Sequence, residues 1–314
     1  MENTGEPYKI ERVDANKLQD LETLYTAVYK VNLPIGFYLK KFDTSFTGVD
    51  YVGYVAYSQD GMPIAYYGVF PCLMQYKDEM ILAAQSGETM THPAYRYKGL
   101  FVILSRMTFA LCRSLGIKLL FGFPNVNSYP GMVGKLGWLM TDTMDRFAIP
   151  IRTIPLARLF GRSGWAMPIY KRYIEWILQK YTRDQPGLTN DLLAQGYGGI
   201  YRDHRYWQYR AYSPTRVIRI GNSLAWIRVR SDLIIGDMHV EGPDFGKAIK
   251  ILRKIAGRLG VRKISFLVSP GTSIHTLFKG SYSSIPSFPV LFQDLGSGIP
   301  LHDIKFTYSD IDIF

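Results

Sequence analysis

The chain has 314 residues, and at roughly 150 residues per domain this length predicts two domains rather than one small module. Hydrophobic residues make up 47% and charged residues 20% of the sequence, an ordinary globular composition that excludes disorder as the main state. The net charge of +11 favours an anionic partner, but it does not distinguish nucleic acid, anionic lipid and a phosphorylated small molecule.

Cysteine usage and hydropathy indicate the cellular compartment in which the protein is expected. The two cysteines, Cys72 and Cys112, lie in apolar stretches, which indicates buried free thiols and excludes a disulfide framework. Residues 1–17 lack the apolar core of a signal peptide, and no run reaches the ~18 uncharged apolar residues of a membrane span. We therefore expect a cytoplasmic protein without stable membrane insertion.

The first half of the chain combines a meander of strands with a strand, helix, strand unit. The tetrapeptide Gln59-Asp60-Gly61-Met62 is typical of a tight hairpin. Apolar periodicity and turn signals predict, in order, a helix over 14–29, strands over 51–58, 63–74 and 80–91, a helix over 99–115 and a buried strand over 117–123. This pattern predicts an α+β fold with a mixed sheet.

The second half repeats that order after a basic and aromatic connection. Residues 150–183 alternate basic with aromatic side chains and predict a helix over 168–181. The later elements are predicted as strands over 216–220, 224–229 and 233–240, a helix over 244–259 and a strand over 263–268. The recurring order suggests an internal duplication, although residue identity between the halves is too low to prove it.

The segment Thr91-His92-Pro93-Ala94-Tyr95-Arg96-Tyr97-Lys98-Gly99-Leu100-Phe101 lies between a predicted strand and a predicted helix. A helix start offers unpaired N–H groups to an anion, and Gly99 would let a pyrophosphate approach the backbone. Arg96 and Lys98 add positive charge beside it. An ordinary strand-to-helix turn with solvated basic residues is the alternative interpretation.

Three motifs in order resemble the GNAT superfamily of acyl-CoA-dependent N-acyltransferases. Arg96-x-x-Gly99 is similar to its pyrophosphate loop, Asn127 to the asparagine after the next strand, and Lys135-Leu136-Gly137-Trp138 to its Lys-Leu-Gly-Phe ending. The resemblance covers most of residues 8–150. It implies acyl-CoA as co-substrate, no metal, and CoA contacts from Thr89, Met90, Thr91, Arg96, Tyr97, Lys98, Gly99, Leu100, Phe101 and Asn127.

The sequence departs from the family pattern at two positions. Phe101 stands where the loop usually has its last Gly or Ala, and Val133 stands where many members carry a tyrosine that protonates the leaving thiolate. Tyr129 is the nearest substitute for that acid, although packing against neighbouring proline turns would explain it equally well.

The resemblance also implies how the acyl donor is held and attacked. The pantetheine arm would pair with the backbone of Thr89 to Thr91, and a backbone N–H near Thr89 would face the developing oxyanion. Glu88, on the same strand, is the first candidate for the general base, although a solvated or ion-paired carboxylate is the alternative. By strand alternation either Glu88 or Gln85 faces the acceptor, but not both.

The second half resembles the degenerate half of tandem GNAT proteins. The turn Glu241-Gly-Pro-Asp-Phe-Gly246 lacks the Arg-x-x-Gly pattern, so a second cofactor site is not expected. The ending Asp310-x-Asp312-x-Phe314 resembles the tail of tandem members from bacterial surface polysaccharide pathways. The resemblance implies a dTDP- or UDP-linked amino sugar as acceptor, and tandem GNAT-like domains at 1–150 and 201–314 joined by a helical connection at 151–200.

Two other functions stay open at this point. The basic-aromatic stretches 152–183 and 201–219 would suit a nucleic-acid surface, although the motifs favour a protein without a nucleic-acid partner. Residues 156–178 are cationic and rich in Leu, Trp and Tyr, which would suit a membrane-peripheral transferase of cell-wall precursors. The histidines have no metal-ligand spacing, and a homodimer is neither required nor excluded.

Overall fold

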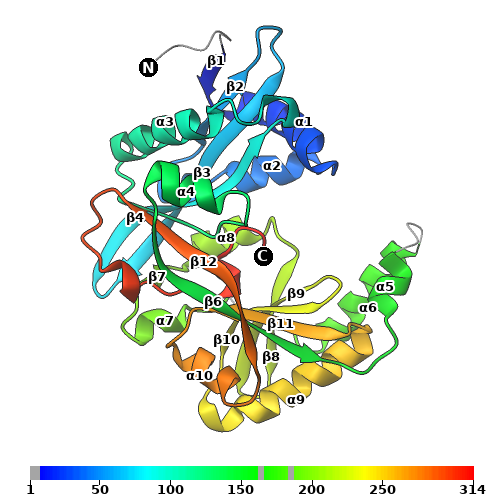
Figure 1. The fold of residues 1–314 in the computed structure, drawn as a ribbon. Coiled ribbons are helices and arrows are strands. Elements are labelled where there is room, and N and C mark those ends of the chain that lie inside the picture. Colours follow the sequence, from blue (N-terminus) through cyan, green and yellow to red (C-terminus); the bar gives the residue numbers. More distant parts are fainter. Residues whose placement is uncertain (1–7, 162–165, 183–186) are drawn as a thin grey trace. The chain divides into compact units, whose positions relative to one another are not determined.

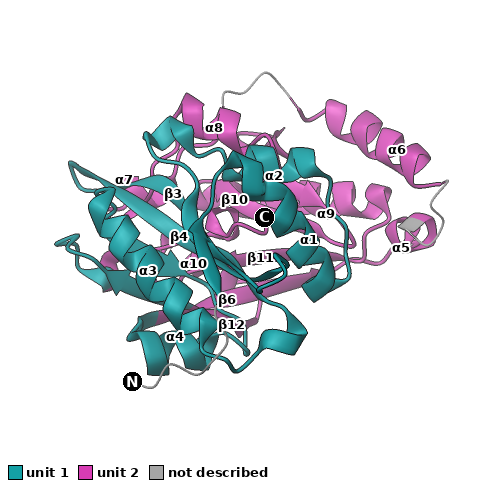
Figure 2. Cartoon of the chain, turned by 90° about the horizontal axis from the view of Figure 1, so that it is seen from above, with its two compact units in different colours: residues 1–141, 290–301 teal, residues 142–289, 302–314 magenta. Residues whose placement is uncertain are grey.

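The computed structural model describes residues 8–161, 166–182 and 187–314, and the chain divides into two compact units. The first unit comprises residues 1–141 and 290–301, and the second comprises residues 142–289 and 302–314 (Figure 2). Each unit has a mostly antiparallel sheet with helices packed on it, which confirms the predicted α+β fold class.

This division differs from the predicted domain boundaries at residues 150 and 200. Strand β6 (Leu139–Pro150) begins in the first unit and continues into the second, and β12 (Ser284–Asp294) returns the chain to the first. The predicted connection at 151–200 belongs to the second unit, because Ile177 and Leu178 lie in its core. The predicted boundaries came from shifts in local composition. The exchange of β6 and β12 between the units depends on pairing between residues far apart in sequence, which composition does not reveal.

The sheet of the first unit follows the predicted meander. Its order is β1-β2-β3-β4-β5, and residues 291–294 of β12 pair with β5 at the end. Neighbours are antiparallel except β4 and β5, which are parallel. The strands are β1 (Lys9–Arg12), β2 (Val52–Tyr57), β3 (Pro63–Tyr76), β4 (Glu79–Thr91) and β5 (Leu119–Gly122).

Helices cover both faces of this sheet (Figure 1). One buried cluster joins Leu21 and Tyr38 of the first two helices to Met90 of β4, and another joins Leu104 of the third helix to Ala84 of β4. The helices are α1 (Leu18–Tyr29), α2 (Ile35–Phe42), α3 (Leu100–Ser114) and α4 (Tyr129–Leu136), with 3-10 turns at Ala15–Lys17, Ser45–Thr47 and Pro93–Tyr95.

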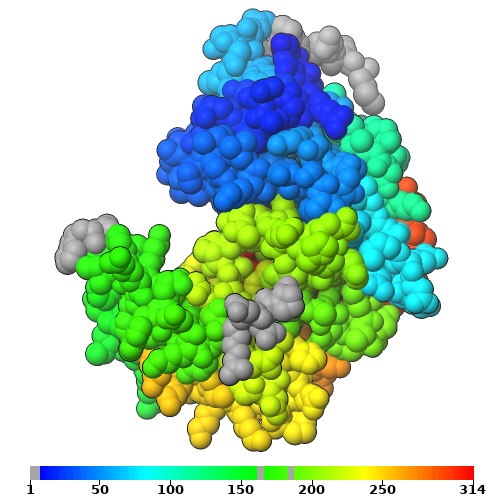
Figure 3. Space-filling model, turned by 180° about the vertical axis from the view of Figure 1, so that it is seen from behind, coloured from blue at the N-terminus to red at the C-terminus, as the bar shows by residue number. Residues whose placement is uncertain are grey.

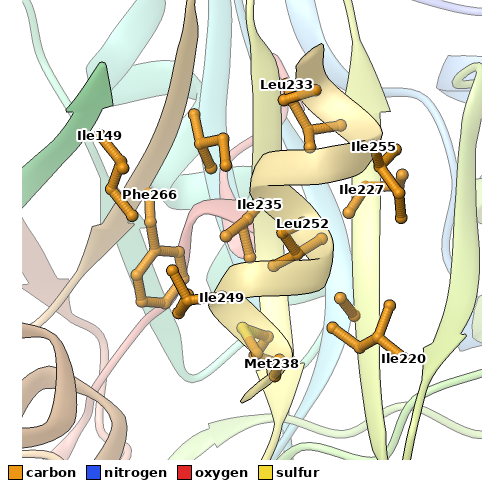
Figure 4. Close-up of a cluster of buried hydrophobic side chains, with 14 of the residues drawn as sticks. Ile149, Ile220, Ile227, Leu233, Ile235, Met238, Ile249, Leu252, Ile255 and Phe266 are labelled. Atoms are coloured by element: carbon orange, nitrogen blue, oxygen red, sulfur yellow. The ribbon is translucent and has the colours of Figure 1, made fainter. Parts of the chain in front are cut away.

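The sheet of the second unit has the order β8-β9-β10-β11-β6, in which β10 and β11 form the parallel pair. Helix α9 (Gly242–Leu259) packs its apolar stripe, including Ile249, Leu252 and Ile255, onto this sheet (Figure 4). The strands that join β6 in this sheet are β8 (Thr215–Ile220), β9 (Ser223–Val229), β10 (Leu233–His239) and β11 (Lys263–Val268), and the short strand β7 (Gly199–Ile200) is not part of this order.

The remaining elements are helices and 3-10 turns of the second unit, the first of these turns beginning at Leu301 of the first unit. They are α5 (Leu156–Gly161), α6 (Met167–Gln179), α7 (Asp191–Ala194), α8 (His204–Arg210), α10 (Ser273–Lys279) and 3-10 turns at Leu301–Asp303 and Tyr308–Asp310. Part of the basic-aromatic stretch, at residues 162–165 and 183–186, lies outside the described residues. Among the helices that the structure describes, none combines the length and apolarity needed to cross a bilayer.

Candidate functional site

The two central strands of the first unit separate where the predicted site begins. Strands β4 and β5 pair only from Ala83 to Gln85, opposite Leu119 to Phe121. Beyond this point β4 continues to Thr91, still paired with β3 on its other side, whereas β5 ends at Gly122. Within the described residues, the β5 side of β4 is therefore an open edge from Ser86 to Thr91. Such an edge can accept an extended ligand by strand addition.

A β-bulge distorts β4 at this open edge. Gly87 pairs with Gly68 and Met90 with Tyr66, so Glu88 and Thr89 together oppose the single residue Tyr67. Glu88 adopts a left-handed backbone with φ of 54°, which a residue other than glycine rarely adopts. The bulge re-aims the backbone groups of Glu88 and Thr89 where β4 has lost its β5 partner.

The bulge also changes which face each side chain occupies. By strict alternation Ala84 and Met90 would share a face, yet Ala84 packs in the α3-side cluster and Met90 in the α1/α2-side cluster. Glu88 reaches Lys41 of α2 and forms an ion pair with it. The alternation rule used to place Glu88 relative to Gln85 therefore does not hold across the bulge.

The Glu88–Lys41 ion pair lies among aromatic rings and is largely buried. The side chains of Lys41 and Glu88 are 3% and 12% exposed, and the Lys41 ammonium lies 4.9 Å from the ring centroid of Phe70. The buried hydroxyl of Tyr38 has no hydrogen-bond partner among the described residues. Burial, and next the charge of Glu88, raises the pKa of Tyr38 and of Tyr66 well above the usual range.

The loop that follows β4 fits an anion. Tyr97 and Gly99 have left-handed backbones with φ of 65° and 81°, and Gly99 caps the start of α3. The first N–H groups of a helix have no partner within it, and a Cβ at Gly99 would meet nothing within 4 Å. Arg96 and Lys98 are exposed beside this start. These features suit a pyrophosphate that lies directly on the backbone.

Phe101 turns its ring away from the loop and into the core. A Cβ on Gly131 would lie 2.9 Å from the Phe101 ring, and the rings of Phe101 and Tyr67 are 5.8 Å apart in an edge-on arrangement. Leu100 is likewise buried. The absence of a side chain at Gly131 thus accommodates the larger residue at 101, which leaves the N–H groups at the start of α3 unobstructed.

The other two predicted site residues follow β5. Asn127 is exposed, and its backbone N–H donates to Oδ1 of Asn125 at 2.9 Å. Tyr129 opens α4, packs at the edge of the α3-side cluster and donates its hydroxyl to Sδ of Met140 at 3.4 Å. Because Glu88 pairs with α2 on the opposite face, the structure does not bring the two predicted catalytic side chains together.

The second unit repeats this architecture but fills the gap with its own chain. Strands β10 and β11 pair only from Leu233 to Ile235, and β10 has a register shift immediately afterwards. Thr307 bridges Val268 at the end of β11, and a Cβ on Gly236 would lie 2.2 Å from the ring of Phe314. The C-terminal segment 304–314 thus lies where an extended ligand would pair.

Buried charge fixes that segment in place. Arg202 pairs with Asp237 at 2.5 Å and with Asp310 at 2.7 Å, and its side chain is fully buried. Arg210 donates to the main-chain oxygens of Ser309 and Phe314 at 3.2 and 3.0 Å. This role was not predicted from the sequence, although an arginine in an aromatic stretch together with an Asp-rich ending was a signal for it.

Residues 10–141 match the family model described as "Acetyltransferase (GNAT) domain". Solved structures that resemble the chain include a GCN5-related N-acetyltransferase from Kribbella flavida, which is 13% identical with a TM-score of 0.58 over 92% of this chain and 72% of that chain. A probable N-acyltransferase from Enterococcus faecalis V583 is 14% identical with a TM-score of 0.59 over 92% and 73%.

A putative acetyltransferase from Pyrococcus horikoshii is 14% identical with a TM-score of 0.54 over 99% of this chain and 96% of that chain. At these identities the structural likeness supports the fold, and it extends over both units. No curated protein sequence matches the chain. Residues 10–141 therefore match a GNAT acetyltransferase domain, which confirms the predicted enzyme class, and this domain family implies acyl-CoA as co-substrate.

Proposed function

We propose that this chain, whose residues 10–141 belong to the GNAT acetyltransferases, moves an acyl group from acyl-CoA to the amine of a nucleotide-linked amino sugar. The observation that carries the proposed acyl-CoA site is the open edge of β4 beyond Gln85, which leads directly to the exposed helix start at Gly99. An extended arm along the edge would end with its pyrophosphate on that helix start.

The residues of the first unit would hold the acyl donor in two places. The N–H groups at Gly99 to Phe101, with Arg96 and Lys98 beside them, would bind the pyrophosphate, and the backbone of Thr89 to Thr91 would pair with the arm. Acyl-CoA supplies an activated thioester, so direct attack by a neutral amine needs no covalent enzyme intermediate. Fixing the amine beside the thioester would remove much of the entropic barrier.

Two side chains are proposed for the proton transfers. Glu88, whose carboxylate pairs with Lys41 on the α2 face, would accept the proton of the attacking amine on that face, and Tyr129 would supply a proton to the departing thiolate from the α4 side. We expect Glu88→Gln to lower turnover while acyl-CoA affinity stays unchanged. A rate that is the same as that of the unmodified enzyme across the pH range would remove Glu88 from the mechanism.

Charge and aromatic content support the proposed acceptor class. The net charge of +11 suits two phosphate-bearing substrates, and an aromatic content of 14% provides rings on which a base or sugar can stack. A thermal-shift panel of acyl-CoAs and dTDP- or UDP-amino sugars tests this. A ligand at 100 times its Kd should stabilise the protein by about 2.7 kcal/mol. No response to any CoA thioester would overturn the proposal.

The outer face of α6 favours a second candidate, a transferase that acts on acceptors at a membrane surface. Ile169 and Trp176, two turns apart, are 55% and 59% exposed, and the Lys180 ammonium lies 5.2 Å from the Trp176 ring. This helix lies on the surface in the green region of Figure 3. Flotation with anionic liposomes tests the candidate, which predicts binding that Trp176→Glu abolishes. Protein that stays at the bottom of the gradient would count against it.

A further inference from the structure

The backbone of Glu88 is held in a conformation that its residue type disfavours. A left-handed φ of 54° suits glycine, and a glutamate adopts it only where surrounding contacts impose it. The proposed reaction depends on this conformation, because the bulge interrupts the pairing of β4 with β3 at Glu88 and Thr89, beside the open edge of β4. The contacts that hold Glu88 are therefore the contacts that set the geometry of the site.

The bulge is braced from the β3 side by an aromatic ring. Tyr66 and Gly68 flank the bulge on β3, and a Cβ on Gly68 would lie 1.8 Å from the Tyr66 hydroxyl. The Tyr66 ring thus lies against the backbone of Gly68 and is fully buried there. This contact limits movement of the bulge toward β3, but within the described part of the chain no hydrogen bond joins Tyr66 to the Glu88 carboxylate.

The α2 side supplies a directed contact. Lys41 extends from the last turn of α2 and meets Oε1 of Glu88, and both side chains are largely excluded from water. A buried ammonium and a buried carboxylate each carry a large desolvation cost, which their pairing offsets only in the observed geometry. Rotation of residue 88 into an extended backbone would move the carboxylate away and leave both charges without this compensation.

We propose that Lys41 is a positioning residue, which holds the β4 bulge in its left-handed form through Glu88 and thereby aims the backbone N–H groups that polarise the thioester. The second part of this inference rests on the proposed acyltransferase function. Lys41 is buried on α2 and meets β4 through its ion pair with Glu88, so its effect on acyl transfer would pass through the backbone of residue 88.

The first test uses the unliganded full chain and does not depend on any substrate. Protein labelled with carbon-13 and nitrogen-15 at glutamate reports the Glu88 backbone through its Cα and Cβ chemical shifts, with Glu88→Gln used to assign the signal. We expect the left-handed shift pattern in the unmodified protein and in Lys40→Met, a neighbouring lysine that is exposed on α2. We expect Lys41→Met to move the shifts to extended values.

The second test measures the thioester itself. Infrared difference spectra of bound acetyl-CoA with a carbon-13 carbonyl report hydrogen bonding to that oxygen as a lowered stretching frequency. We expect Lys41→Met to return the frequency toward that of free acetyl-CoA and to lower kcat about 10- to 100-fold, whereas Lys40→Met changes neither. The Kd of acetyl-CoA should change less than about threefold, because the pyrophosphate loop is untouched.

The outcomes separate the inference from the proposed function. Retention of the left-handed shifts in Lys41→Met would overturn the inference, whatever the activity. Loss of those shifts in a protein that never binds acetyl-CoA would overturn the proposed function and leave Lys41 as the residue that holds the bulge. If Lys41→Met does not fold, Lys41→Met combined with Glu88→Gln buries no charge, and a glutamine-labelled sample gives the same readout. Left-handed shifts in that double variant would likewise overturn the inference.

Discussion

The pyrophosphate loop can be tested with a matched pair of glycines at the two ends of α3. Gly99 precedes the helix with φ of 81° and Gly116 follows it with φ of 77°. Both are exposed, and a Cβ at either position would meet nothing within 4 Å. Substitution by alanine at either site therefore adds the same backbone strain and no steric clash. The two variants differ only in whether the added methyl group faces the proposed pyrophosphate.

The stability effects should be equal and the binding effects should differ. An alanine in the left-handed region costs about 1–2 kcal/mol, which lowers the Tm of a domain of this size by roughly 2–8 °C in both variants. Only Gly99→Ala places a methyl group against the proposed pyrophosphate. Loss of one hydrogen bond to a charged group, about 1.5–3 kcal/mol, corresponds to CoA binding that is about 10- to 150-fold weaker.

Isothermal titration calorimetry with CoA, at a temperature well below either Tm, measures this difference directly. We expect Gly116→Ala to bind CoA as the unmodified protein does. Equal weakening in both variants would mean that affinity follows stability, and unchanged affinity in Gly99→Ala would refute the placement of the pyrophosphate at this loop.

Three further predictions concern the second unit. Arg202→Met leaves the carboxylates of Asp237 and Asp310 buried without their cation, so we expect a loss of about 3–5 kcal/mol in urea unfolding, and a loss below 1 kcal/mol would contradict this. Burial raises the pKa of Asp237 from 3.8 to about 6, so the folded state holds that proton more tightly and loses stability as the pH rises across this interval. Asp237→Asn should flatten this part of the stability profile, and an unaltered profile would exclude Asp237 as its source. Gly236→Val should displace the Phe314 ring and make the C-terminal segment sensitive to limited proteolysis, whereas Gly246→Val on the open side of α9 should not.

Local sequence patterns predicted most elements of the fold. The strand predicted over 263–268 has the same bounds as β11, and the predicted helix over 244–259 differs from α9 by two residues at its start. No strand was predicted for β12, whose prolines at 286 and 289 interrupt the usual strand pattern. The exchange of β6 and β12 between the units left no local signal, because it depends on pairing across distant parts of the chain.

The candidate site was predictable where it depends on residues that are adjacent in sequence. The loop from Arg96 to Gly99 and the start of α3 were placed correctly, since turn chemistry and helix caps are local. The face of β4 on which the Glu88 side chain lies was not predicted correctly, because a bulge breaks the alternation on which the prediction depended. Lys41 was overlooked, since a lysine beside another lysine at a helix end resembles a solvated surface residue.

The pairing of β12 with β5 has a consequence for synthesis. The GNAT domain at residues 10–141 emerges first from the ribosome, but the strand that covers the outer edge of β5 comprises residues 291–294. At a translation rate of about 5–20 residues per second, the β5 edge of the first unit stays unpaired for about 8–30 seconds before β12 is synthesised. An unpaired strand edge is a template for aggregation. A fragment limited to the family-model boundaries would keep this edge permanently, so recombinant production of the first unit requires the complete chain or a supplied β12 strand.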